Sequence, residues 1–162
     1  MTTPTHFPLA SGAGRAGADR IVVVDDDDAT VALLTELLTR AGVSEVHGVS
    51  DAREALRIIR EVDADLVLLD LMMPYVDGYE ILARLRDGDE AGVFRPVLVM
   101  TGDASPAARA RALALEATDV LVKPVPMRQT IQHVLALLRA RHAARADRVV
   151  GSRPPASRPA RL

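Results

Sequence analysis

The sequence predicts an α/β domain whose central parallel sheet is covered by helices on both faces. Short runs of apolar, mostly branched residues alternate five times with stretches whose apolar residues recur at helical spacing. The runs are apolar at consecutive rather than alternate positions, which is typical of strands buried on both faces. The 162-residue chain is 49% hydrophobic, enough for one domain with a substantial core.

The first half of this pattern contains two strand–helix pairs. Residues 21–24 are an unbroken β-branched run, and residues 30–40 follow with apolar side chains along one helical face. That helix stops at Ala41-Gly42, a helix-end signal. A weaker strand over 43–49 precedes a helix over 51–61, whose arginines lie on its outward face.

Two further pairs follow. The apolar run 65–69 is followed directly by Asp70, and a helix over 77–86 opens at an Asp-Gly pair. The apolar run 96–100 leads to a helix over 105–115, where Ser105-Pro106 supplies a cap and a first-turn proline.

A short strand over 119–122 and an amphipathic helix over 127–141 complete the domain, which we expect to cover residues 19–142. Residues 1–18, rich in Gly, Ala, Ser, Thr and Pro, are expected to be a disordered extension. Residues 143–162 are expected to be a basic, Pro- and Arg-rich disordered tail, either a plain solvated extension or a tether to nucleic acid or an anionic membrane surface.

Composition excludes several classes of function. The chain has no cysteine, so it has no disulfides, thiolate metal site or thiol nucleophile, which fits a cytoplasmic protein. No apolar run reaches the roughly 20 residues of a membrane span, and we find no signal peptide. About twenty residues after the domain are too few for a helix-turn-helix, so no DNA-binding domain is expected.

Reactive side chains follow four of the predicted strands. Asp25-Asp26 follow the first, Asp70 the third, Thr101 the fourth and Lys123 the fifth. The lysine is the single Lys in a chain with 19 arginines, which suggests a site needing a compact ammonium group. Because ligands of open α/β sheets bind beyond the carboxyl ends of strands, these groups are candidates for one site.

The chemistry of these groups suits phosphoryl transfer. Mg²⁺ prefers oxygen ligands and is often held by one or two carboxylates and a phosphate, which suits Asp25 and Asp26. Asp70 would then be a carboxylate free to attack phosphorus, with Lys123 and Thr101 binding phosphate oxygens. Asp27 and Asp28 are expected to cap the next helix rather than bind metal.

Four motifs in this order, VVVDDDD, DLMMPYVDGYE at 70–80, LVMTGD at 98–103 and DVLVKPV at 119–125, resemble the receiver domain of two-component response regulators. The resemblance covers roughly residues 19–142 and implies a doubly wound, flavodoxin-like (βα)5 fold with strand order 2-1-3-4-5. It also implies that Asp70 is the phospho-acceptor and that Lys123-Pro124 is a cis peptide.

The remaining site roles are carried over in the same way. Asp25 and Asp26 resemble the acidic pair that binds Mg²⁺ together with Asp70 and the backbone carbonyl of Met72. Thr101 resembles the switch hydroxyl and Lys123 the phosphate-contacting lysine. The sequence departs from the family at Val120, where an aromatic residue is usual, and at Leu115-Glu116-Ala117, which commonly reads Ala-Gly-Ala.

We therefore expect a stand-alone receiver, not a true enzyme, that takes a phosphoryl group from a phosphohistidine of a sensor kinase or phosphotransfer protein and signals to a downstream protein. A homodimer through the fourth helix, fifth strand and fifth helix is a further expectation. Two alternatives stay open: a pseudo-receiver that only binds partners, and a phosphatase of the haloacid-dehalogenase type. The phosphatase would need a second Asp where this chain has Met72.

Overall fold

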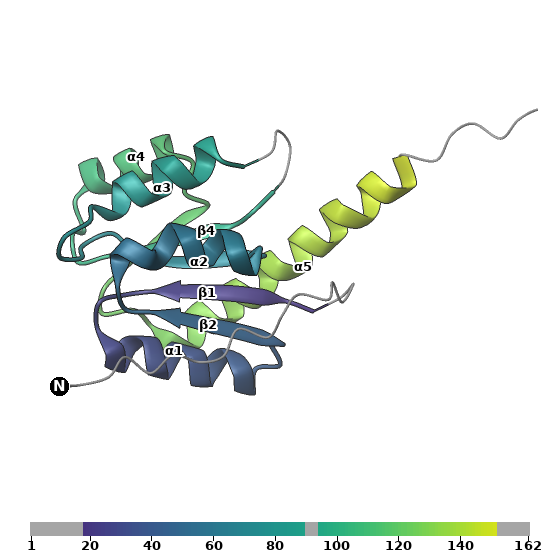
Figure 1. Ribbon diagram of the computed structural model, residues 1–162, viewed down its shortest axis with the longest axis horizontal. Coiled ribbons are helices and arrows are strands. Elements are labelled where there is room, and N and C mark those ends of the chain that lie inside the picture. Colours follow the sequence, from purple (N-terminus) through teal and green to yellow (C-terminus); the bar gives the residue numbers. More distant parts are fainter. Residues whose placement is uncertain (1–17, 90–93, 152–162) are drawn as a thin grey trace, which may run out of the picture.

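The computed structural model describes residues 18–89 and 94–151, with side chains through Asp147. Strands and helices alternate along it (Figure 1). The strands are β1 (Arg20–Val24), β2 (Glu45–Val49), β3 (Leu66–Asp70), β4 (Val97–Thr101) and β5 (Asp119–Val122). The helices are α1 (Asp28–Arg40), the short 3-10 helix η1 (Ala52–Glu54), α2 (Ala55–Val62), α3 (Gly78–Asp87), α4 (Pro106–Ala114) and α5 (Met127–Gly151).

The five strands form one parallel sheet in the order β2-β1-β3-β4-β5, as the receiver resemblance implied. β2 pairs with one side of β1, and the following strands are added on the other side. β1 and β3 are therefore neighbours although β2 lies between them in sequence. The carboxyl ends of β1 and β3 therefore form the switch point at which α/β sheets bind ligands.

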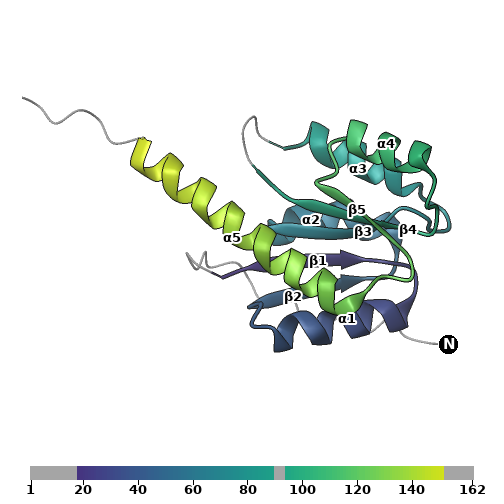
Figure 2. The same cartoon turned by 180° about the vertical axis from the view of Figure 1, so that it is seen from behind.

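Two apolar cores lie on the two faces of the sheet. Val22 and Val24 pack with buried residues of α2, α3 and α4, whereas Ile21 and Val23 pack with buried residues of α1 and α5. Figure 1 shows α2 in front of the sheet, and Figure 2, seen from behind, shows α5 in front. The consecutive apolar residues of β1 thus fill both cores, as the sequence predicted.

The helix starts that the sequence predicts are confirmed by side-chain caps. Asp27 accepts a hydrogen bond from the Ala29 amide, Asp77 from the Tyr79 amide and Ser105 from the Ala108 amide. Hydrogen bonds from Thr30 and Ala29 also lower the pKa of Asp27. Asp27 is therefore engaged as a helix cap, in line with its exclusion from the predicted metal ligands.

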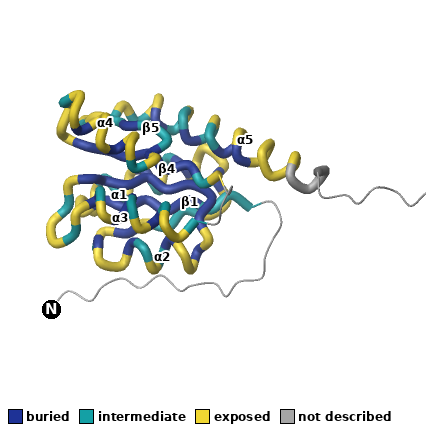
Figure 3. The backbone as a smooth tube through the Cα atoms, turned by 90° about the horizontal axis from the view of Figure 1, so that it is seen from above, coloured by how far each residue is buried: buried dark blue, intermediate teal, exposed yellow. Residues whose placement is uncertain are grey.

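The last helix is longer than predicted. It was expected to end at residue 141, but α5 continues to Gly151, so the prediction of disorder is wrong for residues 143–151. Residues 141–146 consist mainly of Ala and Arg, strong helix formers, and no glycine or proline interrupts the helix before Gly151. Residues 142–147 are exposed (Figure 3). The rest of the predicted tail, 152–162, and the predicted extension, apart from Ala18, lie outside the described residues.

The turn between α4 and β5 contains a residue with left-handed backbone conformation that is not a glycine. Glu116 has φ 63°, a conformation that glycine adopts without strain. Its carbonyl accepts two hydrogen bonds from the Arg86 guanidinium, at 3.1 and 2.7 Å. The departure from Ala-Gly-Ala at this turn thus leaves its backbone conformation left-handed and held by a side chain of α3.

None of the helices in the described part of the chain combines the length and the apolar character that a membrane span requires.

Candidate functional site

The predicted site residues lie along one edge of the sheet. Asp25 directly follows β1, Asp70 and Thr101 are the last residues of β3 and β4, and Lys123 directly follows β5. Val24 is in register with Leu69, so the next residues of these strands, Asp25 and Asp70, stand side by side at the switch point. Parallel strands thus bring together residues that are 22 to 98 positions apart in the chain.

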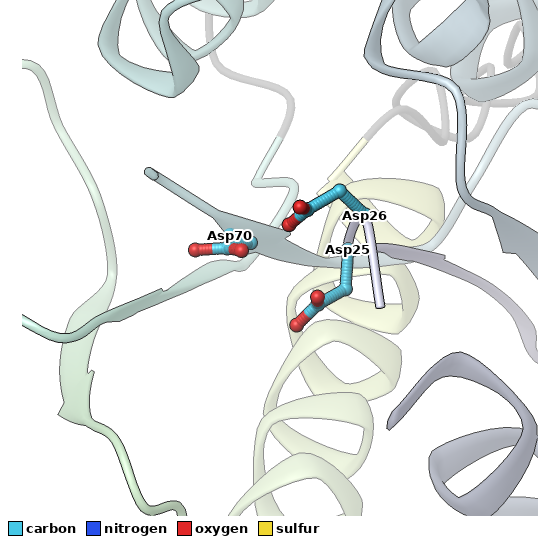
Figure 4. A group of neighbouring side chains, drawn as sticks. All are labelled: Asp25, Asp26 and Asp70. Carbon is cyan, nitrogen blue, oxygen red and sulfur yellow. The ribbon is translucent and has the colours of Figure 1, made fainter. Parts of the chain in front are cut away.

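Three carboxylates form the centre of this edge. One oxygen each from Asp25, Asp26 and Asp70 lies within 4.8 Å of the others (Figure 4). Asp25 is fully buried and Asp70 is 1% exposed, whereas Asp26 is exposed. The cluster therefore has a buried floor and one solvent-facing carboxylate, an arrangement that could hold a divalent cation.

Lys123 joins the two buried carboxylates. Its Nζ lies 2.8 Å from Asp25 Oδ2 and 3.1 Å from Asp70 Oδ2. The other oxygens accept backbone hydrogen bonds, Asp25 Oδ1 from the Asp27 amide at 2.9 Å and Asp70 Oδ1 from the Met72 amide at 3.0 Å. Each buried carboxylate is thus oriented by one ammonium and one amide.

Burial and charge oppose each other at these groups. Burial raises the pKa of the Asp70 carboxyl, and the charge of Asp25 adds to this, while the Met72 amide and Lys123 pull it back only in part. Partial burial lowers the pKa of Lys123, but its bonds and charge contacts with Asp25 and Asp70 outweigh burial and keep this pKa above its ordinary value. Lys123 is therefore a firmly protonated cation at the cluster.

Thr101 is buried at the end of β4, the strand next to β3, and its hydrogen bonds are to residues outside the carboxylate cluster. Its hydroxyl oxygen accepts the Asp103 amide at 3.0 Å, and its carbonyl accepts the Lys123 amide at 2.8 Å. The hydroxyl hydrogen is thus available to another acceptor. The Lys123-Pro124 peptide is cis, as the resemblance implied.

The loop after β3 is pressed against the helix that follows it. A Cβ on Gly78 would lie 2.5 Å from Leu71 Cα and 2.6 Å from the Asp70 carbonyl oxygen. Only glycine allows this approach, so Gly78 fixes the backbone that carries Asp70. The Asp-Gly pair gave a sequence signal for the turn but not for this contact. For Met72, the structure gives the amide contact with Asp70, and the role of its carbonyl stays a prediction.

Sequence reasoning missed two contacts between α3 and α4. The Tyr79 hydroxyl donates to the Ala108 carbonyl at 3.3 Å, and the Arg111 guanidinium lies 3.9 Å from the centre of the Tyr79 ring. These residues belong to different helices, and no sequence pattern pairs α3 with α4. Val120, at the position where the family usually has an aromatic residue, is 7% exposed and packs in the core shared with α2 and α3.

Comparison with known proteins identifies the family. The family model for the response regulator receiver domain matches residues 21–135, so the chain belongs to this family. It is 37% identical over 143 residues to the transcriptional regulatory protein TcrA of Mycobacterium tuberculosis, a match that covers 86% of this chain and 55% of TcrA. The chain spans about half the length of the curated relatives it matches.

Solved structures agree with this assignment. A CheY-like response regulator receiver domain protein from Methanospirillum hungatei superposes with a TM-score of 0.71 at 26% identity, covering 78% of this chain and 98% of that one. A CheX–CheY–BeF3–Mg²⁺ complex from Borrelia burgdorferi matches with a TM-score of 0.66 at 25% identity, covering 74% of this chain and 88% of the matched chain. The doubly wound receiver fold and its place in two-component response regulators are therefore confirmed.

The relatives also correct the expected partners. A stand-alone receiver without a DNA-binding domain was predicted, but relatives such as TcrA are named transcriptional regulatory proteins, and about half of their length lies outside the match. The prediction rested on the short segment after residue 142. The length of that segment does not decide whether a receiver acts together with a DNA-binding domain. We therefore withdraw it.

Proposed function

We propose that this receiver accepts a phosphoryl group on Asp70 from a phosphohistidine of a sensor kinase or phosphotransfer protein. The observation that carries the proposal is the position of Asp70. Its buried carboxylate lies in one cluster with Asp25 and Asp26, and the chain's single lysine bonds both buried members of that cluster. A nucleophile, a group that neutralises phosphate charge and a set of metal ligands are thus within reach of one phosphorus atom.

Mg²⁺ is the cation that best fits the cluster. Its three carboxylates are hard oxygen ligands, and the exposed Asp26 leaves one side open to water and phosphate. A bound Mg²⁺ would draw negative charge from the phosphoryl oxygens during transfer. The matched structure from Borrelia burgdorferi is a complex of CheX and CheY with BeF3 and Mg²⁺, which supports this choice of ion.

The chain's own residues would carry out the transfer. One Asp70 oxygen would attack phosphorus in line, forming an O–P bond as the P–N bond to the donor histidine breaks and its electron pair returns to the imidazole. The Lys123 ammonium, now shared between Asp25 and Asp70, would turn to a phosphate oxygen. The Thr101 hydroxyl hydrogen would bond a second oxygen.

The result is a signal rather than a released product. The acyl phosphate adds charge at a buried position between β1 and β3, and such a local change biases neighbouring loops and helices between two arrangements. Water would later cleave the O–P bond, which releases inorganic phosphate and regenerates the carboxylate. The protein would thus catalyse only its own phosphorylation and dephosphorylation.

Acetyl phosphate with and without Mg²⁺ tests the proposal by intact-mass measurement. The chain is expected to gain one phosphoryl group only with Mg²⁺, and Asp70→Asn is expected to gain none. Asp28→Asn, which changes an exposed first-turn residue of α1, is the matched control and should behave as wild type. Steady release of phosphate from many esters would instead indicate a phosphatase, and no change with any donor would indicate a pure interaction module.

A further inference from the structure

Helix α4 is held to the domain by less apolar contact than its neighbour α3. Its two buried side chains are Ala108 and Ala112, whereas α3 buries three large ones, Ile81, Leu82 and Leu85. Because apolar stabilisation scales with buried area, α3 is firmly seated and α4 is not. Polar contacts at the surface of α4 therefore have a large share in fixing its position.

Three of those contacts tie α4 to the first turn of α3, its neighbour in Figures 1 and 2. The Tyr79 hydroxyl bonds the Ala108 carbonyl at 3.3 Å, and Arg111 stacks over the Tyr79 ring at 3.9 Å. Arg111 also lies 3.6 Å from the Asp77 carboxylate. We call Asp77, Tyr79 and Arg111 the α3–α4 clasp.

The surface between the two helices is hollowed where the clasp lies. Its three residues line an open hollow of about 370 Å³ together with Glu80, Ala83, Ala114 and Leu115. A hollow of this size leaves α4 room to shift against α3, and the clasp bridges it.

The same turn of α3 touches the backbone that carries the acceptor. Gly78 lies between the clasp residues Asp77 and Tyr79, its amide bonds the Leu71 carbonyl at 3.3 Å, and its Cα packs against Asp70 and Leu71. A shift of this backbone must displace Gly78, since no space separates them. Displacing Gly78 moves the clasp residues on either side of it.

A second attachment of α4, to β5, lies further from the site. Arg109 bonds the Asp119 carboxylate at 3.0 Å and the Val120 carbonyl at 3.2 Å, at the start of β5. Lys123 follows the far end of that strand, about 10 Å away at strand rise. The side chain of Val120 is aliphatic and offers no hydrogen bond. The clasp is therefore a more direct route from Asp70 to α4 than the Arg109 contacts. It is separate from the hydrogen bonds that link Thr101 through Asp103 to Ser105, the N-cap of α4.

We propose that the α3–α4 clasp makes the position of α4 depend on the phosphorylation state of Asp70, with Tyr79 and Arg111 as the positioning residues. This inference rests on the proposed function and specifies how that site would be read out. In reverse, a partner that displaces α4 would alter the acceptor loop through the same contacts, because coupling between two sites is reciprocal.

Hydrogen exchange of the α4 amides, compared in the full chain with and without acetyl phosphate and Mg²⁺, tests this proposal. Phosphorylation of wild type is expected to change exchange over residues 106–114. Tyr79→Phe removes only the hydroxyl bond, and Arg111→Met removes the stack and the ion pair. Each is expected to reduce the change about fivefold, the factor that corresponds to about 1 kcal/mol, the size of a net hydrogen bond or of an exposed cation–π contact.

Two matched controls separate the clasp from general effects. Tyr75→Phe changes a tyrosine that is 90% exposed, and Arg84→Met changes an exposed α3 arginine paired with Glu80 of its own helix. Both should keep the full α4 response. Tyr75→Phe also leaves Tyr79 as the one tyrosine in a chain without tryptophan, so its emission reports the clasp directly and should change on phosphorylation.

Intact mass, measured on each sample, distinguishes the two ways to fail. If wild type gains no phosphoryl group, the proposed function fails and this inference falls with it. If wild type is phosphorylated but α4 does not respond, or the clasp variants respond as fully as the controls, the clasp inference alone is overturned. An unchanged Tyr79 emission on phosphorylation of Tyr75→Phe would overturn it as well.

Discussion

Replacing Asp65 by Asn is expected to loosen the outer half of α5 and destabilise the whole domain. Asp65 precedes β3 at the edge of the sheet opposite the candidate site and is 2% exposed. One carboxylate oxygen accepts the Arg20 amide at 3.0 Å and its Nε at 3.4 Å. The other accepts Arg141 at 3.1 Å and Arg145 at 3.3 Å. One side chain thus connects β1, β3 and α5.

The size of the effect follows from the burial of the arginines. The Arg141 side chain is 6% exposed, and removing the partner of a buried charge typically costs 3–5 kcal/mol. Asparagine keeps one oxygen acceptor, and Arg141 retains its bond to the Phe94 carbonyl, so we expect the lower end, about 3 kcal/mol. Arg145, 62% exposed, adds little because water screens its charge.

Urea unfolding followed by circular dichroism measures this loss, and hydrogen exchange over residues 139–147 locates it. Asp63→Asn is the matched control, since Asp63 is 64% exposed and pairs with the same Arg20. It should cost about 0.5 kcal/mol. A loss below about 1 kcal/mol for Asp65→Asn, or one equal to the control, would refute the argument that a buried charge holds α5.

Three further predictions concern the candidate site and its turns. Lys123→Met removes the ammonium bonded to both buried carboxylates and is expected to slow phosphoryl uptake from acetyl phosphate at least about tenfold, as a charge-assisted bond is lost; an unchanged intact-mass time course would contradict this. Gly78→Ala forces a Cβ to within 2.5 Å of Leu71 Cα and is expected to cost about 2 kcal/mol in urea unfolding, whereas equal stability would show that the loop yields freely. Glu116→Gly relieves a left-handed φ of 63° and is expected to stabilise the domain by about 0.5 kcal/mol, less than the relieved strain because glycine gains entropy on unfolding; a lower melting temperature would exclude strain at this residue.

Much of the fold was predictable because local patterns agree with it. Consecutive apolar residues predicted strands buried on both faces, and Ser105-Pro106 and Asp77 predicted the starts of two helices that the structure caps at those residues. The observed ends of the strands and helices differ from the predicted ones by a few residues. Strand ends depend on pairing with neighbouring strands, which the sequence does not show. The strand order was predicted from the family resemblance, because hydrophobic periodicity does not show which parallel strands are neighbours in the sheet.

The candidate cluster was predictable for a geometric reason. Parallel strands end at one edge, so Asp25, Asp70 and Lys123 could be placed together from their positions after predicted strands. No comparable rule pairs Asp65 with Arg141, which lie 76 residues apart and belong to a loop and a helix. The end of α5 was predicted too early. The disorder expected from the prolines after residue 152 was also assumed for the preceding Ala- and Arg-rich stretch, whose composition favours a helix.

Charge balance at the two edges of the sheet separates a structural anchor from a binding site. At the amino edge, the Asp65 carboxylate faces three arginines of the protein itself, one of which also pairs with Asp63, so positive charge is already in excess there. At the carboxyl edge, three carboxylates share one ammonium, that of Lys123, within salt-bridge distance of the two buried members. Like charges so close together repel strongly at low dielectric, so this edge favours an additional positive ion and, with it, a ligand whose charge the ion can balance. This excess of negative charge is therefore an argument, independent of family resemblance, for a cation site in the cluster that contains Asp70, the proposed phospho-acceptor.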